Sequence, residues 1–477
     1  MELNRIQCEA ARRSRDPRFD GRFFIGVATT GIYCRPVCPA PSPRERNVRY
    51  FPSAAAAAEA GFRPCLRCRP ETSPGTPAWG GTSASVSRAL RLIDEGGLAE
   101  SSIESLAGHL GIGSRQLRRL FLQHLGATPV AVVQTRRIHF AKTLIDETGL
   151  PFTRIAMAAG FGSVRRFNAS FQKLYQRTPS ELRRLARRAP SGQAGSYTFR
   201  LRFRPPLDWT ALLGFLAPRA TPGVEVVENG CYRRVIRLGG NVGCLEARLS
   251  PDGDTIHLAV DFPDTQALFL IVERARRMFD LRAEPCSIAA ALKRDPRLAP
   301  RLERHPGLRV PGAWDGFELA VRVILGQQVT VKGATTLAGR IARAFGTPVP
   351  FANGLTHTFP TPEALTAADL TSVGLTRSRA GTIQKLALAA ASGDLDFTKG
   401  TGSDAFLKKL YALPGIGEWT VQYIAMRALG EPDAFPASDL GLLRASGVRT
   451  PRELERLAEA WRPWRAYAAM QLWQSDL

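Results

Sequence analysis

The sequence of 477 residues has no long hydrophobic run and comparatively few acidic side chains. No apolar stretch approaches the roughly eighteen residues that a membrane-spanning helix needs, and the Arg-rich N-terminal segment lacks the apolar core of a signal peptide. We therefore expect a cytoplasmic protein with no membrane partner. Because the length exceeds what one hydrophobic core usually organises, we also expect several domains.

The shortage of acidic residues leaves a formal net charge of +23, from 65 Lys and Arg against 42 Asp and Glu. The excess is uneven: residues 1–190 carry 30 basic and 14 acidic side chains, or +16, whereas residues 191–477 carry 35 and 28, or +7. Such a balance suits a polyanionic partner, and it favours double-stranded DNA or another nucleic acid over an acidic protein.

Half of the eight cysteines form two close pairs, Cys34-x3-Cys38 and Cys65-x2-Cys68. In a reducing compartment this spacing predicts a metal site before a disulfide pair. Zinc prefers four thiolates, and two pairs on separate turns can hold one ion, either as a structural site or as a reactive one. Between the pairs, Ser53 can cap a helix over residues 54–60 that Gly61 ends, which would return Cys65 toward Cys34.

Two segments rich in Pro, Gly and Ser, residues 73–83 and 189–196, break the periodic patterns and predict linkers. Strict alternation over residues 197–203 predicts a strand, and the following runs predict an α+β region. Its expected helices are 209–216 and 266–279, and its expected strands lie within 224–238, 243–249 and 255–260. Helical patterns dominate from Trp314 to the C-terminus.

Residues 100–180 contain an internal repeat. Leu106, Ala107, Gly111, Gly113 and Ser114 recur 49 positions later, and Phe121, Thr128 and Pro129 recur after 50. Each copy has an apolar helix, a Gly-containing turn and a Ser able to cap a second, basic helix, which is the layout of a helix-turn-helix. The alternative is a helical pair with a solvated basic face. The basic residues concerned are Arg115, Arg118, Arg119, Arg165 and Arg166.

A further motif, Leu413-Pro414-Gly415-Ile416-Gly417-Glu418-Trp419-Thr420, lies between apolar helical stretches. Gly415 and Gly417 would let bare backbone N–H groups approach a DNA phosphate at a helix N-terminus, without reading the base sequence. A plain corner between two helices is the alternative. The presence of Asp439 just after a Pro-bearing loop favours a DNA anchor beside a buried carboxylate.

The cysteine region resembles the Ada-type methylphosphotriester-accepting domain over residues 1–76. The resemblance rests on residues 29–38, Thr-Thr-Gly-Ile-Tyr-Cys-Arg-Pro-Val-Cys, and residues 61–68, Gly-Phe-Arg-Pro-Cys-Leu-Arg-Cys. It implies one zinc ion, with Cys34 as ligand and methyl acceptor and Cys38, Cys65 and Cys68 as the other ligands. Zinc keeps such a thiolate nucleophilic at neutral pH. Relatives with a separate O6-methylguanine methyltransferase domain carry a Pro-Cys-His-Arg motif. Here Pro285-Cys286 continues as Ser-Ile, so we expect no such activity.

The repeated region resembles AraC-type DNA-binding domains over residues 83–188, which implies that both units bind promoter DNA through the five basic residues named above. Methylation of Cys34 would change the site from two net negative charges to one and tighten DNA binding. We therefore expect an irreversible switch that promotes transcription of the alkylation response, with RNA polymerase as a further partner.

Residues 197–477 resemble the helix-hairpin-helix DNA glycosylases, and most closely the DNA-3-methyladenine glycosylase II branch. The resemblance rests on the hairpin and on Ile324-Leu325-Gly326-Gln327-Gln328-Val329, Phe359-Pro360-Thr361-Pro362 and Trp461-Arg462-Pro463-Trp464-Arg465. It implies an α+β, TATA-binding-protein-like domain over 197–312 and an all-α glycosylase domain over 313–477.

The resemblance also implies the roles of individual residues. Alkylated purines already depart easily, so a carboxylate that stabilises an oxocarbenium-like sugar suffices, and Asp439 is the candidate. Its alternative role is a loop or helix cap. Strand-cutting relatives carry a Lys where Trp419 stands, so we expect a monofunctional enzyme. Trp419, Tyr423 and Trp473 would line the base pocket, with helix-core packing as the alternative, and Gln328 would fill the gap left by the flipped base.

Together these features predict a multidomain, mostly helical α+β protein that acts as a monomer on damaged and promoter DNA. Its expected function is excision of alkylated purines in base-excision repair, joined to a zinc-thiolate sensor and a transcriptional regulator; the glycosylase itself would need no cofactor. The alternative function is a transcriptional regulator whose glycosylase half only binds DNA.

Overall fold

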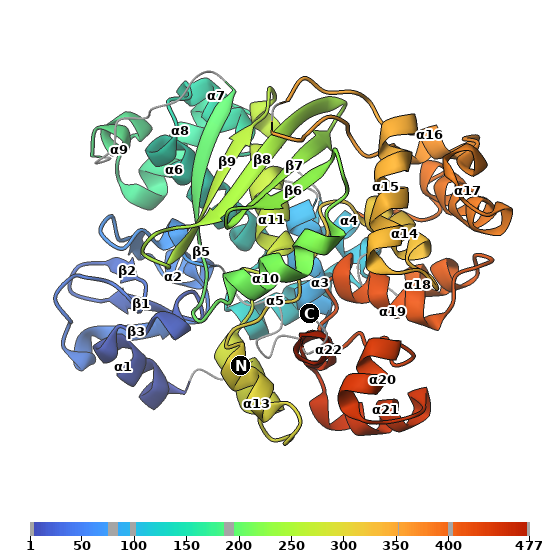
Figure 1. The fold of residues 1–477 in the computed structure, drawn as a ribbon. Coiled ribbons are helices and arrows are strands. Elements are labelled where there is room, and N and C mark those ends of the chain that lie inside the picture. The colour runs from blue at the N-terminus through green and yellow to red at the C-terminus, as the bar shows by residue number, and fades with distance from the viewer. Residues whose placement is uncertain are drawn as a thin grey trace. The chain divides into compact units, whose positions relative to one another are not determined.

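The chain folds into two compact units. Figure 1 labels their helices and strands. The first comprises Met1–Pro205, Asp252–Arg274 and Leu281–Glu284, and the second comprises Pro206–Pro251, Ala275–Asp280 and Pro285–Leu477. The computed structural model describes residues 4–74, 84–95, 102–185, 195–351, 353–398 and 404–474. Among these residues, no helix combines the length and the apolar character needed to cross a membrane.

The two expected linkers, residues 73–83 and 189–196, lie largely outside the described residues, so the boundaries of the four expected domains stay predictions.

The first unit begins with a four-stranded sheet in the order β3-β1-β2-β4. Strand β1 pairs antiparallel with β2 and β3, with Ile25 opposite Cys34 and Tyr50, and β2 pairs parallel with β4. Ser53 caps α2 as predicted, since its Oγ accepts from the backbone N–H of Ala56 at 3.1 Å. The elements are α1 (Arg5–Ser14), η1 (Pro17–Phe19), β1 (Phe24–Val27), β2 (Ile32–Cys34), η2 (Glu45–Asn47), β3 (Val48–Phe51), α2 (Ala54–Glu59), β4 (Arg63–Pro64) and η3 (Pro70–Thr72).

A helical region follows in the same unit and contains the predicted repeat. One copy is α4 and α5, and the other is α7 and α8; Gly111 and Gly160 take positive φ angles of 66° and 75° in the two turns. The long helix α6 joins the copies. The helices are α3 (Ala84–Glu95), α4 (Ile103–His109), α5 (Ser114–Leu125), α6 (Pro129–Glu147), α7 (Phe152–Ala158), α8 (Val164–Tyr175) and α9 (Pro179–Leu185).

The two copies bury equivalent stripes of their second helices. Leu117, Phe121 and Leu125 of α5 are buried at four-residue spacing, as are Phe167, Phe171 and Tyr175 of α8.

The copies differ at the cap. Ser163 Oγ accepts from the backbone N–H of Arg166 at 3.2 Å, but Ser114 is the first residue of α5 and Gly113 stands at its N-cap. The predicted cap at Ser114 is therefore wrong, because a residue within the first turn cannot take the N-cap conformation.

The first unit also contains β5 (Ser196–Arg202), which pairs antiparallel with β9 (Thr255–Asp261). Tyr197, Phe199 and Leu201 of β5 are buried on one face, as the alternation predicted. After η5 (Thr265–Ala267), helix α11 (Leu268–Met278) carries the chain into the second unit, in agreement with the expected helix over residues 266–279.

The second unit starts with α10 (Trp209–Leu216) and η4 (Ala217–Arg219), then an antiparallel meander of β6 (Glu225–Glu228), β7 (Cys231–Leu238) and β8 (Asn241–Leu249). The run 224–238 is thus two strands, not one. Asn229 and Gly230 have φ angles of 51° and 71° and form the tight turn between them.

The remainder of the second unit is helical, as predicted from Trp314 onward. Helix α14 is its centre and packs against α15, α17 and α19, while α20 packs against α22. The elements are α12 (Pro285–Leu292), α13 (Ala299–Arg304), α14 (Gly316–Leu325), α15 (Val331–Phe345), α16 (Pro362–Thr366), η6 (Leu370–Val373), α17 (Arg377–Ala391), α18 (Asp404–Tyr411), α19 (Glu418–Arg427), α20 (Leu440–Ser446), α21 (Pro451–Ala458), η7 (Glu459–Trp461) and α22 (Arg465–Trp473).

Candidate active site and metal centre

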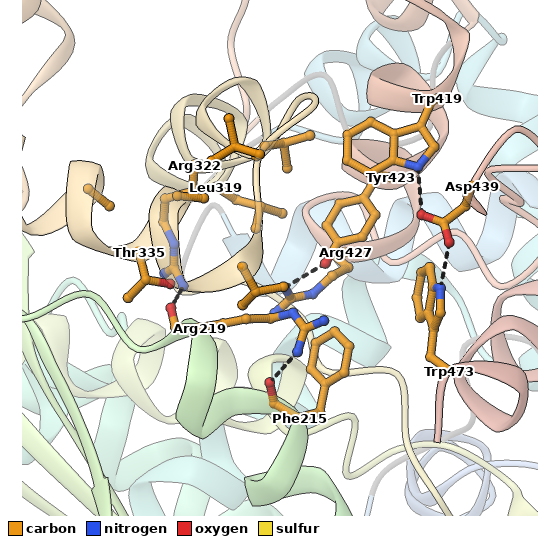
Figure 2. Close-up of a pocket in the computed structure, with 16 residues that line it drawn as sticks. Phe215, Arg219, Leu319, Arg322, Thr335, Trp419, Tyr423, Arg427, Asp439 and Trp473 are labelled. Atoms are coloured by element: carbon orange, nitrogen blue, oxygen red, sulfur yellow. Dashed lines mark hydrogen bonds between the residues drawn. The ribbon is translucent and has the colours of Figure 1, made fainter. Parts of the chain in front are cut away.

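Asp439 stands at the N-cap of α20, and three hydrogen bonds fix its carboxylate. Figure 2 shows the two that come from Trp419 and Trp473. Oδ1 accepts from the backbone N–H of Leu442 at 3.1 Å and from the indole N–H of Trp473 at 3.0 Å. Oδ2 accepts from the indole N–H of Trp419 at 2.9 Å. The side chain is half-buried rather than buried, because it lines a cavity. The same carboxylate can therefore cap the helix and act in the cavity.

Aromatic rings line this cavity, whose volume is about 380 Å³. Trp419 stacks on Tyr423 at a centroid distance of 5.3 Å, and Tyr423 meets Trp473 at 5.8 Å. Phe215 stacks on Trp473 at 6.2 Å. The structure thus brings the three predicted pocket residues together beside Asp439. Phe215 was not identified as a pocket residue, because helix α10 lies some 200 positions earlier in the chain.

Arginine side chains also line the cavity, away from Asp439 (Figure 2). Arg427 donates to the hydroxyl of Tyr423 at 3.3 Å, and Arg219 lies 3.9 Å above the ring of Phe215. Burial alone would raise the pKa of Tyr423, but the charges of Arg427 and Arg219 outweigh it and lower that pKa. This end of the cavity is therefore electropositive.

The hairpin motif connects α18 and α19 through a tight turn. Gly415 has φ +87°, and a Cβ there would overlap the side chain of Thr382. Gly417 is the N-cap of α19, has no side-chain capping bond, and faces open space. The exposed backbone N–H groups of this helix end are thus accessible to an anion.

Gln327 and Gln328 differ in their surroundings. The side-chain amide of Gln327 donates to Gly415 O at 3.0 Å and to Thr420 Oγ1 at 2.9 Å, so it holds the turn in place. Gln328 is exposed and has a positive φ of 55°, a left-handed conformation that residues other than glycine seldom adopt. Sequence reasoning named only Gln328. The adjacent Gln327 carried no separate signal.

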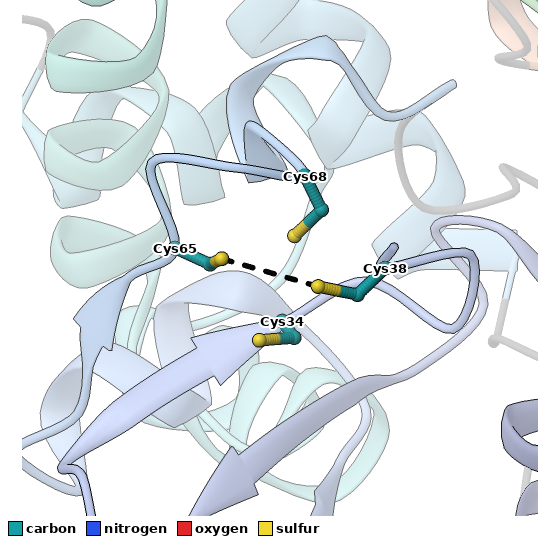
Figure 3. Close-up of side chains that lie close together, drawn as sticks. All are labelled: Cys34, Cys38, Cys65 and Cys68. Carbon is teal, nitrogen blue, oxygen red and sulfur yellow. Dashed lines mark hydrogen bonds between the residues drawn. The ribbon is translucent and has the colours of Figure 1, made fainter. Parts of the chain in front are cut away.

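The four clustered cysteines meet in the first unit (Figure 3). Their Sγ atoms all lie within 4.8 Å of one another, with Cys38 and Cys65 4.0 Å apart. Zinc–sulfur bonds of about 2.3 Å in a tetrahedron separate the sulfurs by about 3.8 Å. The donor set and its geometry therefore fit one zinc ion. Cys34 ends β2 and is partly exposed, whereas Cys65 and Cys68 are buried.

Arg35 contacts the cysteine cluster through both its backbone and its side chain. Its backbone N–H donates to Cys68 Sγ at 3.3 Å, and its guanidinium donates to Cys68 O at 2.9 Å and to Thr72 Oγ1 at 2.8 Å. It also pairs with the buried Asp20. A positive group this close offsets negative charge on the thiolates and fixes their loops.

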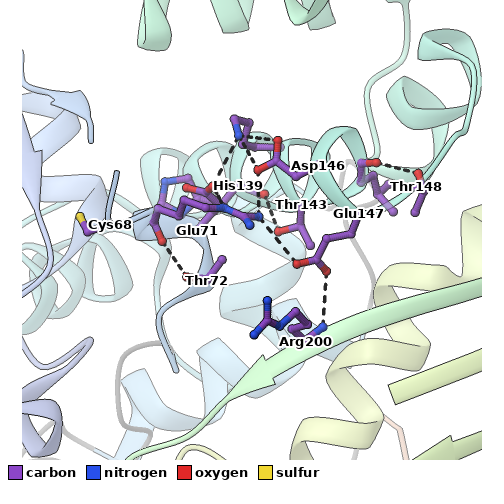
Figure 4. A network of polar contacts seen from close by, with 12 residues as sticks. Cys68, Glu71, Thr72, His139, Thr143, Asp146, Glu147, Thr148 and Arg200 are labelled. Atoms are coloured by element: carbon purple, nitrogen blue, oxygen red, sulfur yellow. Dashed lines mark hydrogen bonds and ion pairs between the residues drawn. The ribbon is translucent and has the colours of Figure 1, made fainter. Parts of the chain in front are cut away.

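A buried polar network connects the loop after Cys68 to helix α6 (Figure 4). Glu71 pairs with Arg69 at 3.2 Å and lies 3.7 Å from Lys142 Nζ, which also pairs with Asp146. Burial raises the pKa of Glu71, but the nearby cations lower it more, so the carboxylate stays charged. Helix α6, which joins the two helix-turn-helix copies, is thus fastened to the cysteine region.

A second cavity, of about 890 Å³, opens beside Cys34. Its lining combines the partly exposed thiols of Cys34 and Cys38 with many cationic side chains, which suits an approaching DNA backbone. Cys34, Cys38 and Cys65 of this lining were predicted from the sequence, whereas the arginines carried no signal beyond the basic composition. They are Arg12, Arg13, Arg15, Arg35, Arg63, Arg67 and Arg177.

The five predicted DNA-binding arginines of the repeat are all exposed on α5 and α8. They are Arg115, Arg118, Arg119, Arg165 and Arg166.

Comparison with known families matches four segments of the chain. Residues 7–71 match the metal binding domain of Ada, and 106–185 match a helix-turn-helix domain. Residues 198–315 match the AlkA N-terminal domain, and 321–465 match the HhH-GPD superfamily base excision DNA repair protein. The first segment contains the four cysteines, and the last contains the hairpin and Asp439.

One relative matches nearly the whole chain. A probable bifunctional transcriptional activator/DNA repair enzyme AlkA of Mycobacterium tuberculosis is 43% identical over 475 residues, covering 98% of this chain and 95% of that protein. The chain belongs to this AlkA-type bifunctional family. The family's repair half is also found alone: DNA-3-methyladenine glycosylase 2 of Escherichia coli is 35% identical over 282 residues, covering 58% of this chain and 97% of that protein.

A solved structure agrees with the AlkA-type assignment. The 3-methyladenine DNA-glycosylase from Archaeoglobus fulgidus aligns with a TM-score of 0.52 at 25% identity, covering 58% of this chain and 98% of that one.

Proposed function

We propose that this AlkA-type protein is a monofunctional DNA glycosylase that releases alkylated purines of the 3-methyladenine type. The observation that carries the proposal is the carboxylate of Asp439, held by the indoles of Trp419 and Trp473 beside an aromatic cavity. The hairpin around Gly415 supplies a sequence-independent grip on the strand, close to that cavity in the same unit.

The proposed reaction is hydrolysis of the bond between base and sugar. A flipped base stacks against Trp419, Tyr423 and Trp473, and the electron pair of the glycosidic bond leaves with the base. Asp439 stabilises the positive charge that develops on the sugar, then positions a water that adds to the sugar carbon and loses one proton to the solvent. The products are a free base and an intact abasic site.

Strand cutting is not part of the proposal, because the cavity lining contains no lysine and Trp419 has no nucleophile. We further propose that the glycosylase needs no cofactor.

The proposal for the first unit is a sensor at Cys34. Cys34, Cys38, Cys65 and Cys68 would hold zinc, which would keep the Cys34 sulfur a thiolate. Cys34 would attack the methyl of an uncharged methylphosphotriester: its sulfur–carbon bond forms, the carbon–oxygen bond breaks, and the phosphate regains its charge. The basic cavity beside Cys34 would seat that backbone.

The thioether leaves the cysteine site with one net negative charge in place of two. We propose that this change tightens promoter binding by the arginines of α5 and α8 and so activates transcription, with RNA polymerase as partner. The active form on DNA would be a cytoplasmic monomer. Promoter affinity that is the same before and after exposure to methylated DNA would contradict this switch, and a methyl mass on Cys34 would support it.

The deciding experiment compares the natural chain with Asp439→Asn on methylated duplex DNA. Asparagine keeps the cap of α20 but not the charge, so the fold should persist while release of bases slows at least about 100-fold. Equal release by both proteins would remove Asp439 from the mechanism. Release by neither would favour a transcriptional regulator whose glycosylase half only binds DNA.

A further inference from the structure

The cavity beside Cys34 is lined partly by the second helix-turn-helix copy. Tyr175 and Arg177, at the end of α8, line it together with residues of the cysteine region. Helix α8 also packs against β4, the strand that leads to Cys65. The cavity is therefore not complete within the cysteine region alone, which the sequence resemblance places at residues 1–76.

Apart from its cysteines, the charged side chains of this lining are all arginines. Three of them form ion pairs with carboxylates outside the lining, namely Arg12, Arg13 and Arg35. The others form no ion pair with any residue that the structure describes; they are Arg15, Arg63, Arg67 and Arg177. The lining thus keeps a positive charge that suits phosphate groups.

Arg177 is exposed and lies in the turn after α8. Gln176 ends the helix in a left-handed conformation with φ 53°, and Tyr175 before it is buried. The nearest acid along the chain, Glu181, accepts from the backbone N–H of Thr178 at 2.7 Å, so its carboxylate is engaged at the start of α9. The guanidinium of Arg177 is therefore available to a ligand in the cavity.

The first copy shows that a helix-turn-helix does not need an arginine at this turn. Residues 125–127 are Leu-Gly-Ala where residues 175–177 are Tyr-Gln-Arg. Gly126 takes the same left-handed conformation, with φ 65°, and a Cβ there would lie 3.0 Å from Pro52. Ala127 is buried. The first turn is thus an apolar contact with the cysteine region, and the second turn instead places a charge at the cavity.

This charge matters because the methylated group itself is neutral. A methylphosphotriester has lost the negative charge of its phosphate, so a guanidinium gains little from it. The phosphates on either side keep their charge, and an arginine can bind such a group through two parallel hydrogen bonds. Unpaired arginines around the thiol can therefore hold the strand by its flanking phosphates, with the neutral group facing Cys34.

We propose that Arg177 binds a phosphate that flanks the methylated one, so that the second helix-turn-helix copy completes the methyl-acceptor site. The inference rests on the proposed sensor function of Cys34. Arg177 is a substrate-binding residue in this role, and the bonds form and break at Cys34. Because Arg165 and Arg166 begin the same helix, methyl sensing and promoter binding share α8.

The test is methyl transfer to the zinc-loaded full chain from a short duplex with one methylphosphotriester, followed by mass spectrometry over a series of protein concentrations. Arg177→Ala should raise the protein concentration for half-maximal rate about tenfold, the factor that one lost hydrogen bond to a charged group implies, and leave the maximal rate unchanged. The slope of this concentration against salt, on logarithmic axes, should fall by about one. Arg177→Lys keeps the charge and should recover part of the loss.

Two controls separate phosphate binding from a structural role. Methyl iodide methylates a thiolate with loss of iodide and needs no phosphate contact, so Arg177→Ala should leave its rate at Cys34 unchanged. The methyl mass on the Cys34 peptide measures that rate. The exposed Arg184 of α9 lies outside the cavity lining, so Arg184→Ala removes the same charge and should leave the half-maximal concentration for DNA nearly unchanged.

Three results would overturn the inference while the sensor stands: an unchanged half-maximal concentration in Arg177→Ala, an equal rise in Arg184→Ala, or slower methylation of Arg177→Ala by methyl iodide. Failure of the natural chain to take a methyl from DNA would instead contradict the proposed sensor function of Cys34.

Discussion

The indole nitrogen of Trp419 donates a hydrogen bond to Oδ2 of Asp439 at 2.9 Å. Trp419 is the second residue of α19, directly after the hairpin glycines, and Asp439 begins α20. One side chain therefore connects the hairpin turn with the carboxylate. The ring of Trp419 also lines the cavity, so this residue fixes the proposed DNA anchor, base pocket and catalytic carboxylate relative to one another.

Replacing Trp419 by Phe should slow base release without emptying the pocket. Phenylalanine keeps an aromatic face but loses the N–H, and a hydrogen bond to a charged group contributes about 1.5–3 kcal/mol, or roughly ten- to a hundredfold in rate. Single-turnover release from methylated duplex measures this effect. Trp473→Phe should have a similar effect, because the indole N–H of Trp473 donates to Oδ1 of Asp439 at 3.0 Å.

Both effects should depend on the carboxylate's charge. In an Asp439→Asn background, Trp419→Phe should add little further loss, because the two residues act as a unit. Fully additive losses would mean that the indole acts on the base alone.

The two hairpin glycines should respond differently to alanine. Gly415→Ala forces a Cβ into Thr382 and a left-handed φ, so it should distort the turn, lower the stability by about 1–3 kcal/mol and weaken DNA binding. In the free protein, a Cβ at position 417 meets open space. The Gly417→Ala variant should therefore have nearly the same unfolding temperature as the natural chain. If Gly417 approaches a phosphate, its variant should still bind an abasic duplex more weakly. Normal DNA binding by the Gly417→Ala variant would contradict a contact between Gly417 and a phosphate.

Features that depend on residue spacing within one region of the sequence could be predicted. The cysteine pairs, the 49-residue repeat, the alternating strand β5 and the hairpin each depend on local spacing, and the structure forms the sulfur cluster, both helical copies and the turn. Of the two predicted capping serines, Ser163 caps α8, but Ser114 lies one position inside α5. Residue propensities do not determine a helix boundary to one residue.

Features that depend on packing between distant elements could not be predicted. Phe215 and Arg219 come from α10 and η4, and they meet Tyr423 and Arg427 of α19 only because the second unit folds around α14. A lone Arg after an apolar helix looks like any surface residue. The electropositive end of the cavity therefore has no sequence signature.

Removing one buried cysteine ligand should empty the metal site. Cys65→Ala should lower the zinc content from about one per chain to near zero, and it should expose the first unit to proteolysis, because metal binding and folding are coupled. Cys286→Ala is the control, since Cys286 is exposed and lies in the second unit. Elemental analysis after gel filtration gives the stoichiometry. Equal zinc in both variants would disprove the four-cysteine site.

Acidification should weaken the first unit through His139 of α6. His139 shares a hydrogen bond of 2.9 Å with the hydroxyl of Tyr33, the residue before Cys34. Burial lowers the pKa of His139 from 6.5 to about 4, with Glu71 raising it and Lys142 lowering it. Between these values the unfolded chain binds a proton that the folded chain does not, so the free energy of unfolding falls as the pH drops from 6.5 to 4.

The size of this effect can be isolated with His139→Gln, which can still bond to Tyr33 but does not titrate. The natural chain should lose up to about 3 kcal/mol relative to the variant across that window, and the difference should be constant above pH 7.5. Urea unfolding of both proteins at several pH values measures it, and proton uptake by the cysteine site cancels because both proteins share it. A difference that stays flat from pH 8 to 4 would show that His139 binds its proton equally well in the folded and unfolded chain, and would contradict the lowered pKa.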